Sequence, residues 1–434
     1  MTQSAHSTSD VVDLKDWLAG NWDPDLTVRE WWERLGPAGW AAPGLPEGRY
    51  GHGLSRAEVL DAQKAIAEAG ALGPPGGLGM LLAAPTVAVH GTPGQVERFV
   101  RPIVTGAHAW CQLFSEPGAG SDLAGLQTRA ERDGDEWVIT GQKVWTSGGQ
   151  IADMGMLLAR TNPDVPKHQG ITYFAFDMRQ PGVEVRPLQE MTGRAIFNEV
   201  FISEARVPHD AVIGELDGGW AVANTTLAFE RAGLGAGGGS GTASPALPGS
   251  VAGDLSKRVG DFARARRGGG YAGPGGTSTF ALLHSVARDL GLVEDPLVRQ
   301  DLARLHTLTE IGRFLTLRHR AVRAQGGDIP GVGNVAKLSM SNILRLGRDA
   351  GLRMLGPRGT LHAYEGGGGP AVPADLPGGR LAGGVTEMAL FAQGPMIYGG
   401  TDQIQRNIIG ERVLGLPKEP NQDKTTPFKD LPRN

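Results

Sequence analysis

The first hundred residues contain the start signals of amphipathic helices. Residues 27–30 (TVRE) and 55–58 (SRAE) both have the form of a capping box. In this motif a hydroxyl and a carboxylate satisfy the first free N–H groups of a helix. We therefore predict two helix starts here and an N-terminal helical domain over residues 1–110.

From residue 111 to about 215 the pattern changes to short runs of β-branched and aromatic residues separated by turn formers. Such runs are typical of strands. Asp133-Gly134 lies between two of them and has the form of a tight hairpin turn. Further strands are expected at 154–159, 171–176 and 199–202. This part of the chain is predicted to form a middle β domain.

Helical spacing returns in residues 216–434. The clearest example is a set of apolar residues at three- and four-residue intervals on one helix face: Leu302, Leu305, Leu308, Ile311 and Leu315. Glycine lowers helix stability by about 1 kcal/mol relative to alanine. The glycine-rich stretch 233–276 is therefore expected to be a flexible loop or an interrupted helix, and glycines 366–369 a surface loop. The whole pattern predicts a multidomain α+β chain that ends in a helix bundle.

Size and charge narrow the class of function. A chain of 434 residues is long enough for two or three cores. Its net charge is −4, and acidic and basic residues are mixed without a sustained basic stripe, so nucleic acid is not an expected partner. Cys111 is the only cysteine and cannot form an internal disulfide, so we expect a small buried apolar residue there.

The sequence contains no pattern that directs it to a membrane. Residues 1–13 are polar and acidic, without the basic and apolar regions of a secretory signal. The most apolar run, residues 78–89, is interrupted by Pro85 and is too short for a bilayer core of about 30 Å. We expect a cytoplasmic protein without membrane insertion.

Two segments of the β domain combine glycines with hydroxyl groups. Residues 115–122 (SEPGAGSD) follow a predicted strand and expose backbone N–H groups, although alone they could equally form a plain turn. Residues 141–149 (GQKVWTSGG) strengthen the interpretation as a binding loop, because an indole at a strand end is followed by two hydroxyls. An indole can cover one face of an aromatic cofactor, and hydroxyls can donate to its ring nitrogens.

A third glycine segment lies near the end of the chain, at residues 398–406 (YGGTDQIQR). Gly399, Gly400 and Thr401 precede a helix expected over 402–413. The N-terminal amides and the dipole of a helix favour an anion at this position.

Together these segments resemble the signature of the acyl-CoA dehydrogenases. The resemblance extends from the N-terminal helices to residues 412–414. In the middle domain it depends on the spacing of Glu116, Trp137, Trp145, Val207, Pro208 and Gly214. It implies a helical domain, a β-barrel domain and a helix bundle, with FAD as the cofactor and an acyl thioester of coenzyme A as the substrate.

The resemblance also implies roles for individual residues. The hydroxyls of Ser115 and Ser147 would face the isoalloxazine, and Thr401 and Gln403 would lie near the FAD phosphates. The full set of implied FAD contacts is Phe114, Ser115, Gly120, Ser121, Trp145, Ser147, Thr401 and Gln403. Substrate contacts are implied for Ser121, Arg231 and Gly399.

The residue after Tyr398 departs from the family, because Gly399 stands where many members have their catalytic glutamate. The reaction requires a carboxylate that removes the α-proton while the β-hydrogen leaves as hydride. A subset of the family uses a glutamate that precedes an arginine on another helix, and Glu230-Arg231 has the matching position. We take Glu230 as the candidate base. The alternative is a helix-surface glutamate in an ion pair worth at most about 1 kcal/mol. Asp402 is expected to interact with its own helix dipole.

Two further segments depart from the family pattern. Residues 353–357 (RMLGP) replace the usual glutamine and double glycine in a segment that touches the FAD of a neighbouring subunit. The expected Arg-x-x-Phe-Gly stretch near residue 285 is absent, which leaves Arg288 as a possible phosphate contact.

The first functional hypothesis is an acyl-CoA dehydrogenase of lipid β-oxidation. Such an enzyme forms a trans-2-enoyl-CoA, passes electrons to an electron-transfer flavoprotein, and assembles as a homodimer or tetramer. The second is an inactive partner subunit of a heteromer, which Gly399 favours and Glu230 opposes. The third is a flavin oxidase or monooxygenase on the same fold. The sequence does not encode the acyl chain in a readable pattern.

Overall fold

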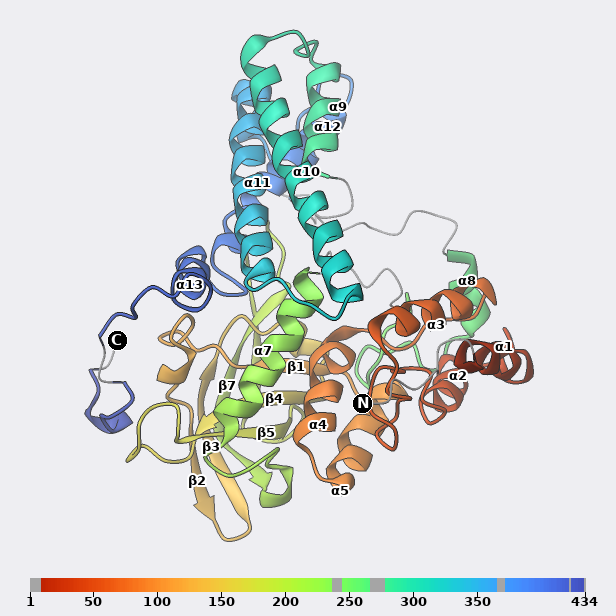
Figure 1. Ribbon diagram of the computed structural model, residues 1–434, viewed down its shortest axis with the longest axis vertical. Helices are drawn as coiled ribbons and strands as arrows, with labels where there is room; N and C mark the ends of the chain where they lie inside the picture. Colours follow the sequence, from red (N-terminus) through yellow and green to blue (C-terminus); the bar gives the residue numbers. More distant parts are fainter. Residues whose placement is uncertain (1–8, 236–243, 266–277, 365–370, 421–422, 433–434) are drawn as a thin grey trace.

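The computed structural model describes residues 9–235, 244–265, 278–364, 371–420 and 423–432 (Figure 1). Helices form the first part of the chain, a single sheet the middle and helices again the last part. The predicted multidomain α+β architecture is therefore confirmed. Within the described residues, no helix is long and apolar enough to cross a membrane.

The N-terminal helices begin where the capping residues predict. Thr27 caps α2 and Ser55 caps α3, each with the complete reciprocal pair of hydrogen bonds to a glutamate. Both capping boxes are confirmed. The helices of this part are α1 (Ser9–Asn21), α2 (Val28–Leu35), α3 (Arg56–Glu68), α4 (Ala84–His90), α5 (Pro93–Gln95) and α6 (Arg101–Val104). Two π-helical turns, Gly79–Ala83 and Val96–Val100, precede α4 and α6.

The middle of the chain forms a seven-stranded sheet with the order β1-β4-β2-β3-β7-β6, in which β5 also pairs with β4. The strands are β1 (Trp110–Leu113), β2 (Arg129–Asp133), β3 (Glu136–Lys143), β4 (Met154–Arg160), β5 (Ile171–Asp177), β6 (Val183–Leu188) and β7 (Phe197–Pro208). The predicted hairpin at Asp133-Gly134 joins β2 to β3, and the three other predicted strands correspond to β4, β5 and β7. Cys111 is buried in β1, where desolvation raises the pKa of its thiol to about 12.

The helices after the sheet lie in different parts of the molecule. A long helix, α7, crosses the sheet at β5, with α4 on its other side (Figure 1). The helices α9 to α12 form a bundle that projects from the rest of the molecule (Figure 1). The bounds are α7 (Gly219–Gly235), α8 (Val259–Ala265), α9 (Thr279–Asp289), α10 (Pro296–Ala324), α11 (Val332–Leu355), α12 (Gly379–Phe391) and α13 (Asp402–Ile408). The helix expected over 402–413 is α13 continued by a π-helical turn, Ile409–Val413.

The predicted apolar face of α10 is only partly buried in this chain. Leu302 and Leu305 lie in the core of the bundle, whereas Ile311 is 56% exposed. The neighbouring residues Phe314 and Leu317 are also exposed. The helical prediction is therefore confirmed, but a single chain covers only the first part of this face.

Of the two alternatives for the glycine-rich stretch, the described residues fit the interrupted helix better, since α7 ends at Gly235 and α8 spans Val259–Ala265. Both glycine triplets, 237–239 and 268–270, lie outside the described residues, as does the cluster 366–369. Residues 244–265 between the triplets are not a flexible loop, because they pack against the N-terminal helices. The N–H of Val28 donates to the carbonyl of Lys257 at 2.8 Å, and Leu255 and Val259 are buried in the N-terminal core. Long-range burial here overrides the local preference of glycine-rich sequence.

Candidate functional site

The ends of β1 and β3 lie side by side. The N–H of Val144 donates to the carbonyl of Ser115 at 2.9 Å, which holds the residue after Phe114 next to the residue before Trp145. Phe114 is buried and Ser115 is half-buried. The backbone therefore brings together Phe114, Ser115 and Trp145, three of the residues predicted to contact the cofactor.

A buried carboxylate fixes the loop that follows Ser115. Glu116 accepts hydrogen bonds from the N–H groups of Gln127 at 2.6 Å and Thr128 at 2.9 Å, and from the ammonium of Lys143 at 2.8 Å. Backbone bonds between Glu116 and Ala119 close a tight turn inside the loop. The loop is thus tied at its base, while Gly120 is exposed at its tip.

The charge state of Glu116 follows from these donors. Burial is the largest single influence and raises the pKa of the carboxyl, but the charge and hydrogen bond of Lys143, with the Thr128 and Gln127 bonds, outweigh it. The pKa of Glu116 is therefore below its ordinary value. The carboxylate is therefore charged at neutral pH, while burial lowers the pKa of the Lys143 ammonium and Glu116 acts in the opposite direction.

Trp145 is held in an unusual conformation at the end of β3. Its φ angle is +61°, a region that residues other than glycine rarely adopt, and its indole is 56% exposed. The following residue, Thr146, is anchored by two backbone hydrogen bonds with Asn198. Ser147, next along the chain, is exposed. A strained residue that presents a large ring to solvent is a candidate ligand surface, since burial would otherwise stabilise the indole.

Glu230 on α7 faces β1. The amide of Gln112 contacts the carboxylate at 3.5 Å, and Gln112 lies three residues before Ser115. Glu230 is half-buried and forms no ion pair with any described residue, unlike the helix-surface glutamate of the alternative interpretation. Desolvation raises the pKa of its carboxyl, although the Gln112 bond and the charge of Arg231 act in the opposite direction.

Arg231 follows Glu230 and lies within electrostatic range of Arg412. Burial lowers the pKa of the Arg231 guanidinium, Glu230 raises it, and the charge of Arg412 lowers it again. Arg412 lies in the π-helical turn after α13, so its charge acts on α7 from the helical stretch that follows the third glycine segment. Sequence patterns did not point to Arg412 or to Gln112. The one usable signal was a polar residue, Gln112, within the otherwise buried strand β1.

The third glycine segment has a fixed backbone. Gly399 and Gly400 have φ angles of +63° and +81°, the left-handed region that favours glycine. The Gln405 side chain donates to the carbonyl of Gly399 at 2.9 Å and accepts from Asn334 of α11 at 2.7 Å. These bonds fix the loop in front of α13.

The residues at the start of α13 differ in their contacts and in their exposure to solvent. The Thr401 hydroxyl accepts from the N–H of Ile404 at 3.1 Å as the helix cap, and Gln403 is exposed. Asp402 does more than interact with the helix dipole, because it is buried and contacts the ammonium of Lys337 at 3.4 Å. Within the described part of the chain, no hydrogen bond or ion pair joins Thr401 or Gln403 to Ser115 or Trp145.

The two segments that depart from the family pattern near the expected inter-subunit contacts both lie in the helix bundle. Arg353 forms an ion pair with Asp301 of α10. Arg288 lies exposed in the last turn of α9.

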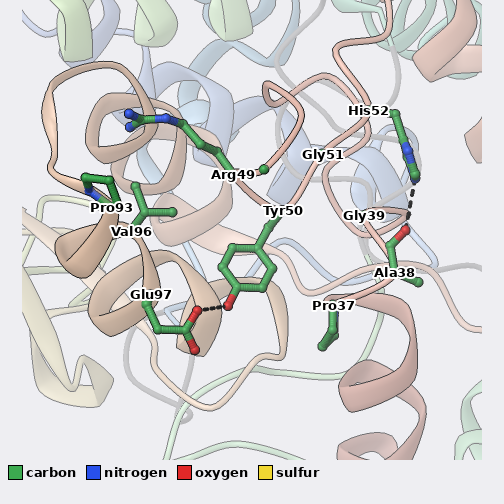
Figure 2. A pocket seen from close by; sticks show the side chains of 11 residues that line it. Pro37, Ala38, Gly39, Arg49, Tyr50, Gly51, His52, Pro93, Val96 and Glu97 are labelled. Atoms are coloured by element: carbon green, nitrogen blue, oxygen red, sulfur yellow. Dashed lines mark hydrogen bonds between the residues drawn. The ribbon is translucent and has the colours of Figure 1, made fainter.

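A separate cavity of about 360 Å³ lies in the N-terminal part, between residues 37–39, 48–52 and 93–97 (Figure 2). Tyr50 crosses it, with a φ angle of +66°, and its hydroxyl donates to the carboxylate of Glu97 (Figure 2). Desolvation, with this hydrogen bond, raises the pKa of Tyr50 to about 12. None of the predicted site residues lines this cavity, so it is distinct from the candidate site.

Comparison with known proteins identifies the family. The sequence profile of the acyl-CoA dehydrogenase middle domain matches residues 111–204, and that of the acyl-CoA dehydrogenase C-terminal domain matches residues 277–414. The acyl-CoA dehydrogenase IpdE1 of Mycobacterium tuberculosis (strain ATCC 25618 / H37Rv) is 36% identical over 391 residues, which cover 90% of this chain and 88% of IpdE1. The chain belongs to the acyl-CoA dehydrogenase family.

Other relatives agree with this assignment. The acyl-CoA dehydrogenase FadE34 of the same organism is 39% identical over 380 residues, or 87% of this chain, but the chain spans only 44% of the length of FadE34. Among solved structures, the Tcur3481-Tcur3483 steroid ACAD has a TM-score of 0.65 at 27% identity and covers 96% of this chain and 99% of its own. The predicted family and fold are confirmed.

Members of the family are FAD-dependent oxidoreductases, and the residues at the end of β1 and β3 fit a flavin. An exposed indole, Trp145, can cover one face of the isoalloxazine. The hydroxyls of Ser115 and Ser147 stand on the two segments beside it and can donate to the ring edge.

We predict that Glu116→Gln lowers the free energy of unfolding by about 3–5 kcal/mol, since it leaves the Lys143 ammonium buried without a counter-charge. Urea unfolding at neutral pH measures this change. Glu184→Gln is the control, because Glu184 pairs with Arg186 on the surface and its loss should cost less than about 1 kcal/mol. Equal effects of the two substitutions would contradict the prediction.

Proposed function

We propose that this chain catalyses the FAD-dependent α,β-dehydrogenation of an acyl-CoA thioester to the trans-2-enoyl-CoA, with Glu230 as the base. The single observation that supports the proposal best is the position of the Glu230 carboxylate, which faces β1 at Gln112 just before Ser115. A half-buried carboxylate that forms no ion pair with a described residue is suited to act as a base, because desolvation raises its proton affinity.

The proposed reaction forms one carbon–carbon double bond. Glu230 removes the α-proton of the thioester as the β-hydrogen leaves with its electron pair. When bound, FAD would supply the acceptor for that hydride, and we propose an electron-transfer flavoprotein as the final acceptor of the two electrons. This places the chain in lipid β-oxidation, and we propose a cytoplasmic location.

Gly399 supplies a second part of the proposed site. The α-C–H becomes acidic enough only when hydrogen bonds to the thioester carbonyl stabilise the developing enolate. The N–H of Gly399 donates no hydrogen bond within the described residues, and the Gln405 side chain holds the carbonyl of the same residue. We propose this N–H as a carbonyl donor, with Ser121 contacting the acyl-CoA and Arg231 organising the base.

The remaining proposed contacts belong to FAD. We propose that Phe114, Ser115, Gly120, Ser121, Trp145 and Ser147 line the flavin side of the site. Thr401 and Gln403 would meet the phosphates at the start of α13, where free amides and the helix dipole favour an anion. The Thr401 hydroxyl can still donate its proton while its oxygen accepts the cap bond.

We propose that the exposed part of the α10 face is an interface with a second copy or a homologous subunit. Ile311, Phe314 and Leu317 recur at three-residue intervals and are all exposed in the single chain. A contiguous apolar face of this kind marks a protein contact. Two solved neighbours, the Tcur3481-Tcur3483 steroid ACAD and the ChsE4-ChsE5 complex from Mycobacterium tuberculosis, each combine two components.

The second candidate function is an inactive partner subunit of a heteromeric acyl-CoA dehydrogenase. Gly399 favours it, because the glutamate that many members place there is missing. The visible spectrum of the chain purified alone separates the two functions. A yellow protein that is bleached by acyl-CoA supports the enzyme, whereas a colourless one supports the partner role. The thioester panel should include a steroid-derived acyl-CoA, since one solved neighbour is a steroid ACAD.

We predict that Glu230→Gln lowers the rate of flavin reduction by about 10²- to 10⁴-fold, the usual contribution of a general base. The substitution should not lower the melting temperature at neutral pH, because it removes a charge that burial disfavours. Stopped-flow bleaching and thermal unfolding give the two values.

The control for this experiment is Glu310→Gln, which removes a carboxylate paired with Arg313 on the surface of α10. Flavin absorbance should be unchanged in both variants. If Glu230→Gln retains full turnover with FAD bound, Glu230 is not the base.

We predict that Gln112→Leu shifts the acid limb of the kcat/KM profile to higher pH. The Gln112 hydrogen bond lowers the pKa of Glu230, so its loss raises that pKa further, and a base is inactive below its pKa. Gln142→Leu is the matched control, since Gln142 donates to Glu199 on β7 in the same domain. A limb that stays in place or moves to lower pH would argue against Glu230.

We predict that the double substitution Ile311→Glu with Phe314→Glu converts the assembly to monomers. Two carboxylates in an apolar contact lose hydration without gaining partners. Light scattering after gel filtration measures the mass. Leu297→Glu is the control, because Leu297 is exposed in the first turn of the same helix, away from this face. An unchanged mass would show that the contact lies elsewhere.

A further inference from the structure

The C-terminal segment 423–432 packs against the loop between β4 and β5. The N–H of Phe428 donates to the carbonyl of Val165 at 2.9 Å, and that of Lys429 donates to Pro163 at 3.0 Å. Pro427 and Pro166 form an isolated antiparallel bridge beside them. Several backbone contacts therefore hold this segment in register on the β domain.

A buried arginine connects that loop to the loop that follows Ser121. The guanidinium of Arg160 donates to the carbonyl of Lys167 at 2.6 Å and to that of Ala124 at 2.6 Å. The ring of Phe428 covers the same guanidinium, with 3.7 Å between the ring centroid and Cζ. The C-terminal segment thus covers the arginine that links the two loops.

Lys167 makes the direct connection. Its ammonium contacts the carboxylate of Asp122 at 2.8 Å and that of Asp423 at 2.6 Å, and its side chain is largely buried. Burial opposes the charge, but the two carboxylates outweigh it and raise the pKa of Lys167 above its ordinary value. The ammonium therefore stays charged and bridges the two acids at neutral pH.

The bridge lies next to the Ser121 loop on one side and near the start of α7 on the other. Asp122 follows Ser121, the residue proposed to contact the acyl-CoA. On the other side, His168 follows Lys167, and its ring packs edge-on against Trp220 with 4.9 Å between the centroids. Trp220 lies in the first turn of α7, the helix that bears Glu230.

We propose that Lys167 and Asp423 are positioning residues that hold the Gly120–Asp122 loop in the conformation that binds acyl-CoA. The C-terminal segment is then a component of the substrate site. This inference depends on the proposed function, because it takes Ser121 as a substrate contact. Asp423 supplies a second counter-charge to Lys167. This ion pair fixes the position of the ammonium, which in turn binds Asp122.

The test uses Asp423→Asn in the full-length protein with FAD bound. We expect KM for acyl-CoA to rise about tenfold, a factor that corresponds to about 1.4 kcal/mol, with kcat, flavin content and melting temperature unchanged. Asp423→Glu should restore the wild-type KM. Lys429→Ala is the matched control, because Lys429 lies in the same segment but pairs with the exposed Asp164. An unchanged KM in Asp423→Asn, or an equal rise in Lys429→Ala, would overturn the proposal.

A second measurement separates this inference from the proposed function. Hydrogen exchange of the amides in residues 120–127 should be faster in Asp423→Asn than in the wild type, and unchanged in Lys429→Ala. This readout does not need turnover, so it tests the positioning role even if no acyl-CoA bleaches the wild type. Failure of bleaching overturns the proposed function. Equal exchange in the three proteins overturns the positioning role.

Discussion

The candidate site depends on the buried ion pair between Glu116 and Lys143. The carboxylate gathers two backbone amides from beyond the loop, and the ammonium also donates to the carbonyl of Phe114 at 3.1 Å. Glu116 therefore holds both ends of the loop that follows β1. Lys143, the last residue of β3, holds the end of β1. A buried pair of this kind contributes little net stability compared with apolar residues, because desolvation offsets the attraction. Its evident effect is geometric, since it fixes Ser115 and Trp145 relative to each other.

Two glutamates near β1 show how environment separates chemical roles. Glu116 has three donors and a pKa below its ordinary value, whereas Glu230 has one weak donor and a pKa above it. The same side chain thus serves as a fixed structural anion in one place and as a candidate proton acceptor in the other. Divergent environments for nearby carboxylates are a common basis for acid–base function. The cost is local, because desolvating the Glu230 carboxylate without a cation weakens folding at neutral pH.

Local sequence signals predicted most of the fold. The capping boxes at Thr27 and Ser55 and the hairpin at Asp133-Gly134 are encoded within a few residues, so they could be identified without knowledge of the rest. Residues 244–265 could not be placed in this way, because the partners that order them, such as Val28, lie more than two hundred residues earlier.

The same distinction applies to the site. The residue types at Ser115, Trp145 and Ser147 are visible as a motif, and the structure brings Ser115 beside Trp145. The contact of Gln112 with Glu230 and the bridge from Asp122 through Lys167 to Asp423 join distant segments, and no spacing rule predicts them. Periodicity also could not predict that part of the α10 apolar face is exposed, because it shows that a face is apolar but not what covers it.

The paired left-handed glycines before α13 have a consequence for how this lineage can change. A side chain on Gly400 would meet the amide nitrogen of Gln405 at 2.6 Å, and both glycines have torsion angles that other residues adopt only with strain. An acid introduced after Tyr398 would adopt a strained torsion angle, as Glu204 and Asp217 do elsewhere in this chain at φ angles of +54° and +63°. Local strain, rather than a strict block, is therefore what the main chain sets against a carboxylate at this position.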